Sequence, residues 1–220
     1  MPGITGIISR VATGEEESRL GSMVQCMLHE PFYTSGRFVD RERGFFVGFV
    51  SIEGSFSDCM PVYNEKKTIV LFLTGECYVD DAVISELRGR GHDVDGDSAR
   101  FLVHLYEERR DLIFSELNGW YNGLLLDMER GKAFLFNDRF GIRRIYYHES
   151  DAGFYFSSEA KSLLKVFPEL RALRSESVAE YLVYDAVLED KSCFPGVSCL
   201  PPASAWVLEK GCPGPERRSY

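Results

Sequence analysis

Apolar residues occur along this chain mostly in short runs that have the length of β-strands. Residues 44–52 (GFFVGFVSI) are apolar, aromatic and β-branched, which is typical of a strand. Residues 68–74 (TIVLFLT) are apolar at successive positions, which indicates a strand covered on both faces. Glycine-spaced apolar residues 2–8 predict a first strand whose backbone another group can approach closely.

A second group of apolar runs, separated by short turns, predicts a β-meander. Its strands are residues 120–128, 132–137, 144–148 and 153–157, with turns at 129–131, 138–141 and 149–152. A last strand is expected around residues 205–208. The turn Asp138-Arg139-Phe140-Gly141 is interpreted as a structural one that contains an ion pair.

Helices are predicted between these strands. The helical segments are residues 82–88, 98–107, 112–117, 159–166 and 176–182. Asp80, Asp97 with Ser98, and Ser175 precede three of them and are interpreted as N-caps. In the second helix the apolar residues lie on one face. Antiparallel strands with helices between them predict an α+β layered fold with two antiparallel sheets.

Composition agrees with a globular protein: of 220 residues, 45% are hydrophobic and 27% are charged. A net charge of −9 argues against a nucleic-acid partner. No apolar run has the length of a membrane-spanning helix, and the N-terminus lacks the features of a secretory signal, so we expect a cytoplasmic protein without a membrane partner. The six cysteines form no CxxC pair and the four histidines no HxxxH spacing, so we expect free thiols and no metal.

A few residues are candidates for chemistry. Removal of Met1 would expose Pro2, whose amine can act as a base but which supplies no nucleophilic thiol or hydroxyl. The run Thr74-Gly75-Glu76 can offer backbone N–H groups and a carboxylate to a ligand, or it can be an ordinary strand-to-loop turn with a solvated Glu. Asp97 is read either as an N-cap or as a ligand contact. Cys77 has no basic neighbour in sequence, so a buried bystander is favoured over a substitute nucleophile.

Several segments together resemble the N-terminal glutaminase domain of asparagine synthetase and its relatives, the class II, N-terminal-nucleophile (Ntn) glutamine amidotransferases. MPGITGII at the start is similar to the family's Met-Cys-Gly-Ile-x-Gly-Ile, and TGECYV at 74–79 to its Asn-Gly-Glu-Ile-Tyr-Asn. The strongest likeness is NDRFGIRRIYY at 137–147, followed by FSSEAKSLL at 156–164. Further matching segments are LNGWYNGLLLD at 117–127 and FPGVSCLPPA at 194–203.

This resemblance implies an Ntn-hydrolase-like four-layer sandwich, in which two antiparallel sheets are stacked between helices. It also implies a glutamine site with a Cys nucleophile, an Arg and an Asp that hold the amino-acid groups of glutamine, and an Asn-Gly oxyanion hole. On the matching positions, Pro2 replaces the Cys, Phe49 the Arg and Thr74 the Asn. The retained positions are Gly75, Glu76 and Asp97. The family's His-Arg-Gly-Pro-Asp loop is reduced to His29-Glu30-Pro31.

These replacements predict a degenerate domain, a pseudoenzyme with no catalytic residue, whose role in an asparagine synthetase-like, ATP-dependent carbon–nitrogen ligase is structural. Residues 1–190 would form this domain, and the Pro- and Gly-rich residues 191–220 would lead to a synthetase domain. That synthetase domain would be the partner of the present chain. It would bind ATP and Mg²⁺, whereas the present chain is expected to bind no cofactor. A homodimer is a further possible assembly. One alternative is an active asparagine synthetase, which would use either free ammonia or glutamine with Cys77 as the nucleophile. The other is a binding module that reuses the old glutamine pocket for another ligand.

Overall fold

The structure is a computed structural model that describes residues 2–94, 96, 98–210, 212 and 214–220. The chain forms two compact units, each built around one antiparallel sheet. Unit 1 consists of Met1–Val50, Arg144–Pro201 and Lys210–Gly214, and unit 2 of Ser51–Arg143, Pro202–Glu209 and Pro215–Tyr220. No helix among the described residues is long and apolar enough to cross a membrane.

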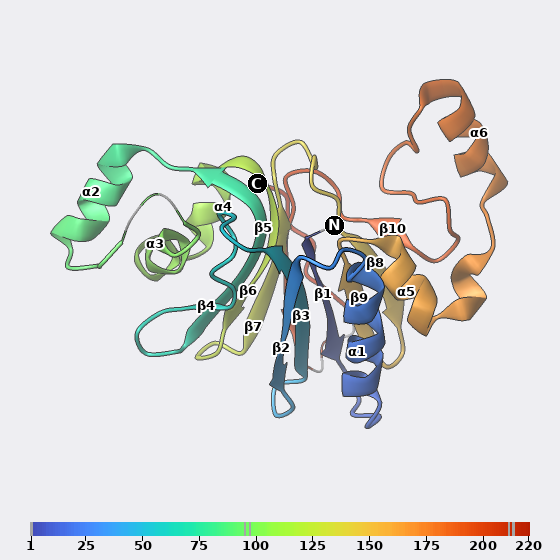
Figure 1. Cartoon of the computed structure of the whole chain (residues 1–220), viewed down its shortest axis with the longest axis horizontal. Coiled ribbons are helices and arrows are strands. Elements are labelled where there is room, and N and C mark those ends of the chain that lie inside the picture. Colours follow the sequence, from blue (N-terminus) through green and yellow to red (C-terminus); the bar gives the residue numbers. More distant parts are fainter. Residues whose placement is uncertain (1, 95, 97, 211, 213) are drawn as a thin grey trace. The chain divides into compact units, whose positions relative to one another are not determined.

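Unit 1 contains a six-stranded sheet in the order β10-β8-β9-β1-β3-β2. Its strands are β1 (Gly3–Ser9), β2 (Tyr33–Asp40), β3 (Phe45–Ile52), β8 (Tyr146–Ser150), β9 (Gly153–Ser157) and β10 (Ser198–Cys199). β1 lies inside the sheet, antiparallel to both β3 and β9, and all its residues are buried. Helices α1 (Glu16–Met27) and α5 (Ala160–Val166) cover one face, where Ile7, Phe46 and Tyr155 contact the buried side of α1 (Figure 1).

Beyond α5, unit 1 continues through the 3-10 turn η2 (Pro168–Arg171) into α6 (Ser175–Tyr184). Figure 1 shows α6 extending away from the sheet of its unit. The C-terminal end of α6 exposes four consecutive large side chains, Tyr181, Leu182, Val183 and Tyr184. An exposed apolar group of this kind is typical of a surface that contacts another molecule or domain.

Unit 2 contains a five-stranded sheet in the order β11-β7-β6-β5-β4. Its strands are β4 (Val62–Tyr63), β5 (Ile69–Tyr78), β6 (Asn118–Asp127), β7 (Lys132–Asn137) and β11 (Ala205–Glu209). The helices are α2 (Asp81–Gly89), α3 (Phe101–Arg109), the 3-10 turn η1 (Arg110–Leu112) and α4 (Ile113–Glu116). Leu71 and Leu73 of β5 belong to one apolar cluster with α3 and α4, which shows that these helices cover one face of the sheet.

The α+β prediction with two antiparallel sheets is therefore confirmed. The predicted strands 2–8, 44–52, 132–137, 153–157 and 205–208 correspond to β1, β3, β7, β9 and β11. The last thirty residues take part in both sheets, because β10 pairs with β8 and β11 with β7.

The predicted β-meander is wrong, because its strands belong to different sheets. β6 and β7 pair in unit 2, whereas β8 and β9 pair in unit 1. The turn at residues 138–141 is consequently the start of a connection that leaves one sheet, and no hairpin forms there. Short turns between apolar runs indicate antiparallel neighbours, but they do not distinguish a hairpin from a crossing between sheets.

Some helix boundaries also differ from the predictions. α3 begins at Phe101, so Ser98 lies before the helix and is not its N-cap, while Asp97 lies outside the described residues. The first six residues of α3 are all buried, which excludes the expected single apolar face. Ser175 is the first residue of α6, and the preceding Arg174 makes no side-chain cap. Asp80 does cap α2, since its carboxylate accepts a hydrogen bond from the N–H of Ala82.

Unit 1 contains elements that were not predicted, among them α1 and β2. α1 buries Leu20, Met23, Val24 and Met27, which have helical spacing but are diluted by polar neighbours. β2 is an edge strand with half-buried and exposed side chains, so its hydrophobic pattern is weak.

Candidate functional site

The start of β1 is closely surrounded by residues of unit 1. A Cβ on Gly3 would lie 2.6 Å from Cβ of Ser158 and 2.9 Å from Cε of Met27, so only glycine fits at this position. The N–H of Ile4 donates to Oγ of Ser158 (3.0 Å), and the N–H of Ser158 donates to the carbonyl of Ile4 (2.8 Å). These contacts fix the backbone next to Pro2, which is itself half-buried.

Polar side chains follow directly after Ser158. Nζ of Lys161 lies 2.7 Å from Oε2 of Glu159 and 3.1 Å from Nδ1 of His29. Burial acts to raise the pKa of Glu159, but the hydrogen bond from Lys161 opposes it, and the pKa lies below its usual value. Glu159 and Lys161 belong to the FSSEAKSLL motif at 156–164, but the sequence predicted no site role for them.

Phe49 is a neighbour of the start of β1, because its register partner is Ile4. Phe46 and Val50 of the same strand contact α1, so strand alternation places Phe49 on the opposite face of the sheet. Its half-buried ring lies over the backbone of Gly36, where an added Cβ would come within 2.4 Å of the ring. Phe49 therefore offers an apolar ring, and no cationic group, to the face of the sheet opposite α1.

The run Thr74-Gly75-Glu76 lies inside a strand, and the strand-to-loop interpretation is wrong. β5 continues to Tyr78 because its partner β6 begins at Asn118 and pairs along the whole length. Gly75 has a φ of +96°, and a Cβ there would lie 2.0 Å from the carbonyl oxygen of Trp120. This position therefore requires glycine for both its conformation and its close approach to β6.

Glu76 belongs to a group of polar and aromatic side chains within unit 2. Its register partner is Trp120, whose Nε1 donates to the hydroxyl of Tyr78 (3.2 Å). That hydroxyl donates to Oε2 of Glu76 (3.4 Å). The guanidinium of Arg143 lies over the Trp120 ring, 4.4 Å from its centroid. Burial lowers the pKa of Arg143, although the charge of Glu76 acts to raise it.

Arg143 and Trp120 were not identified as site residues from the sequence. Both belong to segments that resemble family motifs, but these segments do not predict that the two side chains contact each other. Pairing of β5 with β6 brings Trp120 to Glu76, and the loop after β7 brings Arg143 to Trp120.

Asp138 organises that loop. Its Oδ1 accepts hydrogen bonds from the N–H groups of Phe140 (3.0 Å) and Ile142 (3.1 Å), and its Oδ2 accepts one from the N–H of Arg143 (3.1 Å). The side chain is fully buried. These bonds support the interpretation of this turn as structural. The expected ion pair between Asp138 and Arg139 is replaced by backbone contacts of both side chains, because Arg139 donates to the carbonyl of Ser115.

Comparison with known proteins identifies the family. Residues 1–217 match the family described as glutamine amidotransferase domain. The chain belongs to this family. It is 29% identical over 166 residues to asparagine synthetase [glutamine-hydrolyzing] 2 of Bacillus subtilis (strain 168), which covers 74% of this chain and 22% of that protein. It is 24% identical over 212 residues to asparagine synthetase [glutamine-hydrolyzing] 1 of the same organism, which covers 94% of this chain and 33% of that protein.

The chain thus spans between about a fifth and a third of the length of these curated relatives. Its fold is that of the Ntn amidotransferases. A solved structure of glutamine phosphoribosylpyrophosphate amidotransferase from B. subtilis, described as complexed with ADP and GMP, superposes with a TM-score of 0.63. That comparison has 14% sequence identity and covers 99% of this chain and 49% of the other.

In this amidotransferase domain the predicted site residues fall into both units. Pro2 and Phe49 belong to unit 1, whereas Thr74, Gly75 and Glu76 belong to unit 2. Within unit 1, the pairing of Phe49 with Ile4 brings the first two near each other. Asp97 lies outside the described residues.

Cys77 is a core residue of the domain. Its side chain is 3% exposed and belongs to the apolar cluster of unit 2. Burial raises its pKa far above the usual value, and the negative charge of Asp138 acts in the same direction. These surroundings disfavour the thiolate that a nucleophile requires. All six cysteines, which lie in the described part of the chain, are free thiols.

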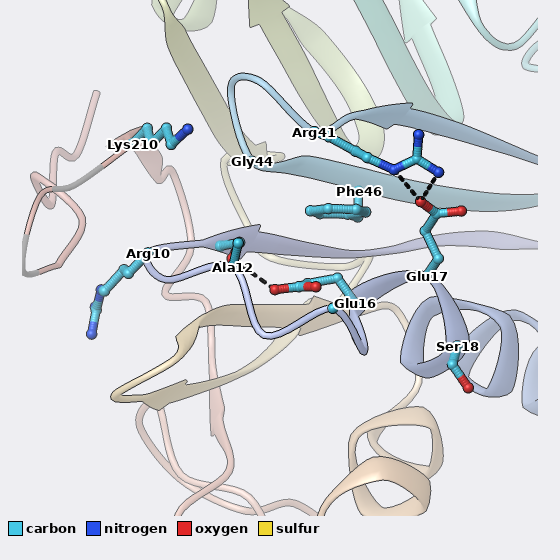
Figure 2. Close-up of a pocket in the computed structure, with 11 residues that line it drawn as sticks. Arg10, Ala12, Glu16, Glu17, Ser18, Arg41, Gly44, Phe46 and Lys210 are labelled. Atoms are coloured by element: carbon cyan, nitrogen blue, oxygen red, sulfur yellow. Dashed lines mark hydrogen bonds and ion pairs between the residues drawn. The ribbon is translucent and has the colours of Figure 1, made fainter.

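A cavity of about 530 Å³ lies at the other end of β1 (Figure 2). Figure 2 shows the pair Glu17–Arg41 on one side of it and Arg10 and Lys210 on the other. Glu16 accepts hydrogen bonds from the N–H of Thr13 (2.7 Å) and from Oγ of Ser9 (3.2 Å). None of the described residues predicted for the glutamine site lines this cavity.

Proposed function

We propose that this chain is a glutamine amidotransferase-type domain that does not hydrolyse glutamine, and that it serves as a structural partner of an ATP-dependent, amide-forming synthetase domain. The observation that carries the proposal is the residue at the nucleophile position of the family motif. Pro2 stands there, and it has neither a thiol nor a hydroxyl. Covalent catalysis at that position lacks the thiol or hydroxyl that would attack the glutamine amide.

Two further positions support this proposal. A clamp on the glutamine carboxylate needs a cation, but Phe49 presents a half-buried ring above Gly36. The oxyanion hole of the family uses an Asn side chain, whereas Thr74 is a shorter, buried residue with a single hydroxyl donor. Loss of one oxyanion donor alone reduces turnover by about 10²–10³-fold.

An active enzyme with Cys77 as the nucleophile is the main alternative. Burial of that thiol and its raised pKa argue against it, because a catalytic cysteine needs exposure and a lowered pKa. An enzyme that uses free ammonia would also lack glutaminase activity, so it differs from our proposal only in the reaction of the synthetase domain.

The proposed parent protein is supported by the relatives, whose chains are several times longer than the matched segment. The exposed apolar end of α6 offers a surface for such a domain. Six free thiols support a reducing, cytoplasmic location. A Ser-Gly-Gly-x-Asp-Ser segment following Tyr220 in the parent gene would support the ligase assignment, and its absence would argue against it.

The test of the proposal is a restoration series. Ammonia release from glutamine is measured for Pro2→Cys, for Pro2→Cys with Phe49→Arg and Thr74→Asn, and for Cys77→Ala. We expect activity only in the triple variant, because Pro2→Cys alone still lacks the cation and the amide donor. Strong activity in Pro2→Cys alone would show that Phe49 or Thr74 is not at the position we assign.

Glutamine binding provides a second readout. Isothermal titration calorimetry of the unmodified chain should detect no binding at millimolar glutamine, since an apolar ring disfavours a carboxylate. Saturable glutamine binding would instead support a binding module that reuses the old pocket.

A further inference from the structure

Two histidines of unit 2 lie among carboxylates, apart from the residues assigned to the glutamine site. Glu65 is in the connection between β4 and β5, His92 follows α2, and His104 and Glu107 are one turn apart on α3. One potential ligand atom each from Glu65, His92 and His104 lies within 4.8 Å of the other two. The sequence contains no HxxxH motif, and only the spacing of His104 and Glu107 points to this group.

The ring nitrogens converge on one carboxylate oxygen. Oε2 of Glu107 lies 3.2 Å from Nδ1 of His104 and 3.9 Å from Nδ1 of His92. Oε1 of Glu65 lies 3.8 Å from the same nitrogen of His104. The two imidazole rings are 4.9 Å apart between centroids. Both Nδ1 atoms therefore lie near Oε2 of Glu107, and Nδ1 of His104 also lies near Oε1 of Glu65.

Hydrogen bonds outside this group orient its members. Nδ2 of Asn64 donates to Oε1 of Glu107 (2.8 Å), which leaves Oε2 directed at the histidines. Asn64 is itself fixed, because its Oδ1 accepts from the N–H groups of Thr68 (2.8 Å) and Ile69 (2.9 Å). Such supporting hydrogen bonds are typical of protein metal sites.

The contact of His92 with Glu108 sets the tautomer that a metal needs. Nε2 of His92 lies 3.0 Å from Oε1 of Glu108, and a carboxylate only accepts hydrogen bonds. The proton of neutral His92 is therefore on Nε2, which leaves Nδ1, 3.9 Å from Oε2 of Glu107, unprotonated. A carboxylate–histidine–metal arrangement has this order of groups. By the same rule Nδ1 of His104 donates its proton to Oε2 of Glu107 (3.2 Å) in the ion-free chain, and a bound ion would displace this proton.

We propose that Glu65, His92, His104 and Glu107 bind a divalent transition metal ion, with zinc as the preferred ion. Imidazole and carboxylate ligands in a four-coordinate arrangement suit zinc, with bonds of about 2.0–2.2 Å and hence ligand atoms about 3.3 Å apart. The contacts at 3.8 and 3.9 Å are too long for hydrogen bonds and would shorten around an ion. Glu65 is exposed and can move to complete the site.

The bound ion would join three segments that are distant in sequence: the β4–β5 connection, the segment after α2, and α3. It would stabilise unit 2 and would not take part in glutamine chemistry. Since the ligands come from a different set of residues, this inference is independent of the proposed loss of glutaminase activity.

The experiment uses the chain after treatment with EDTA. Zinc is titrated by calorimetry, and cobalt(II) is titrated by absorption spectroscopy. We expect one zinc ion per chain, a raised melting temperature, and cobalt ligand-field bands without a thiolate-to-cobalt charge-transfer band. His92→Gln and Glu107→Gln should each weaken zinc binding at least about tenfold.

His148→Gln is the matched control, because His148 hydrogen-bonds to the carbonyl of Gly196 in unit 1 and is outside the group. It should leave zinc affinity unchanged. Glu65→Gln alters an exposed side chain, so it should weaken zinc binding without affecting folding. If a histidine variant is unstable, the zinc affinity of Glu65→Gln tests the proposal in its place. Absence of zinc binding, equal affinity in all four variants, or a thiolate charge-transfer band would overturn the proposal.

Discussion

Two regions of this domain match the same family's motifs, but they differ in the kind of residue that matches. One region keeps residues with a backbone role, and the other differs at positions that we assign to side chains that act on substrate. In unit 2, Gly75 and Asp138 are among the residues that match the family motifs, and each has a backbone role. Gly75 permits a positive φ against Trp120, and Asp138 accepts three backbone N–H groups. In unit 1, Pro2 and Phe49 stand at the positions that we assign, from the family resemblance, to a nucleophile and a cation.

The difference follows from what each residue is required to do. A backbone conformation or a buried hydrogen-bond acceptor is needed as long as the chain folds. A thiol or a guanidinium that touches only substrate is needed as long as the reaction occurs. Under our proposal we therefore expect residues with a backbone role, such as Gly75 and Asp138, to persist after residues that contact only substrate have been replaced.

The largest expected effect is at Gly75. Gly75→Ala should reduce the free energy of unfolding by about 4 kcal/mol, because it combines an unfavourable φ with a collision against the β6 backbone. Urea denaturation measures this change. Gly54→Ala is the control, since Gly54 also has a positive φ (+76°) but no atom within 4 Å of an added Cβ, and it should cost about 1 kcal/mol. Equal effects would show that β6 does not constrain this position.

Asp138→Ala should have the next largest effect, about 3 kcal/mol. It leaves the N–H groups of Phe140, Ile142 and Arg143 without their acceptor. Asp80→Ala removes a single exposed N-cap bond and should cost only about 1 kcal/mol by the same denaturation measurement. A loss below that of Asp80→Ala would mean that the loop does not depend on Asp138.

Phe49→Arg should be tolerated at a cost of about 1 kcal/mol, because the ring is half-buried and an Arg stem can cover the same surface. The same substitution at Phe46, which is 5% exposed and packed against α1, should cost at least about 3 kcal/mol. Thermal unfolding of the two variants tests the comparison. Equal destabilisation would make Phe49 a core residue and remove it from the old site.

The smallest effect concerns Glu159, beside the start of β1. Because Lys161 and the other groups around it lower the folded-state pKa, the carboxylate stabilises the fold above its unfolded-state pKa of about 4.3, and this contribution is lost as pH falls through the folded value. Glu159→Gln should therefore cost less than about 1 kcal/mol at pH 7 and nothing at pH 2. Urea denaturation at both pH values checks this, and a pH-independent difference would contradict it.

Much of the fold could be predicted from the sequence, because β-branched and aromatic runs such as 44–52 and 132–137 are strong local signals. The division of the strands between two sheets could not, since the loop at Asp138 looks like a hairpin turn until its hydrogen bonds are known. α1 was missed because its four buried apolar residues are diluted by polar ones.

The candidate site was predictable only where a motif marked it. Pro2, Phe49 and Thr74 followed from the resemblance, but the conformation of Gly75 depends on pairing with β6, which is a long-range interaction. Arg143 reaches Trp120 through such an interaction as well. The histidine cluster is another case, because its residues come from three separate segments.

The central claim is that the unmodified chain does not hydrolyse glutamine. The most direct measurement is NMR detection of ¹⁵N-ammonium from amide-¹⁵N-glutamine incubated with the wild-type chain, beside a relative that retains the Cys of the motif. Our account predicts ammonium at the rate of the buffer blank with this chain and rapid release with the relative. Release from the wild-type chain that rises with protein concentration would contradict it.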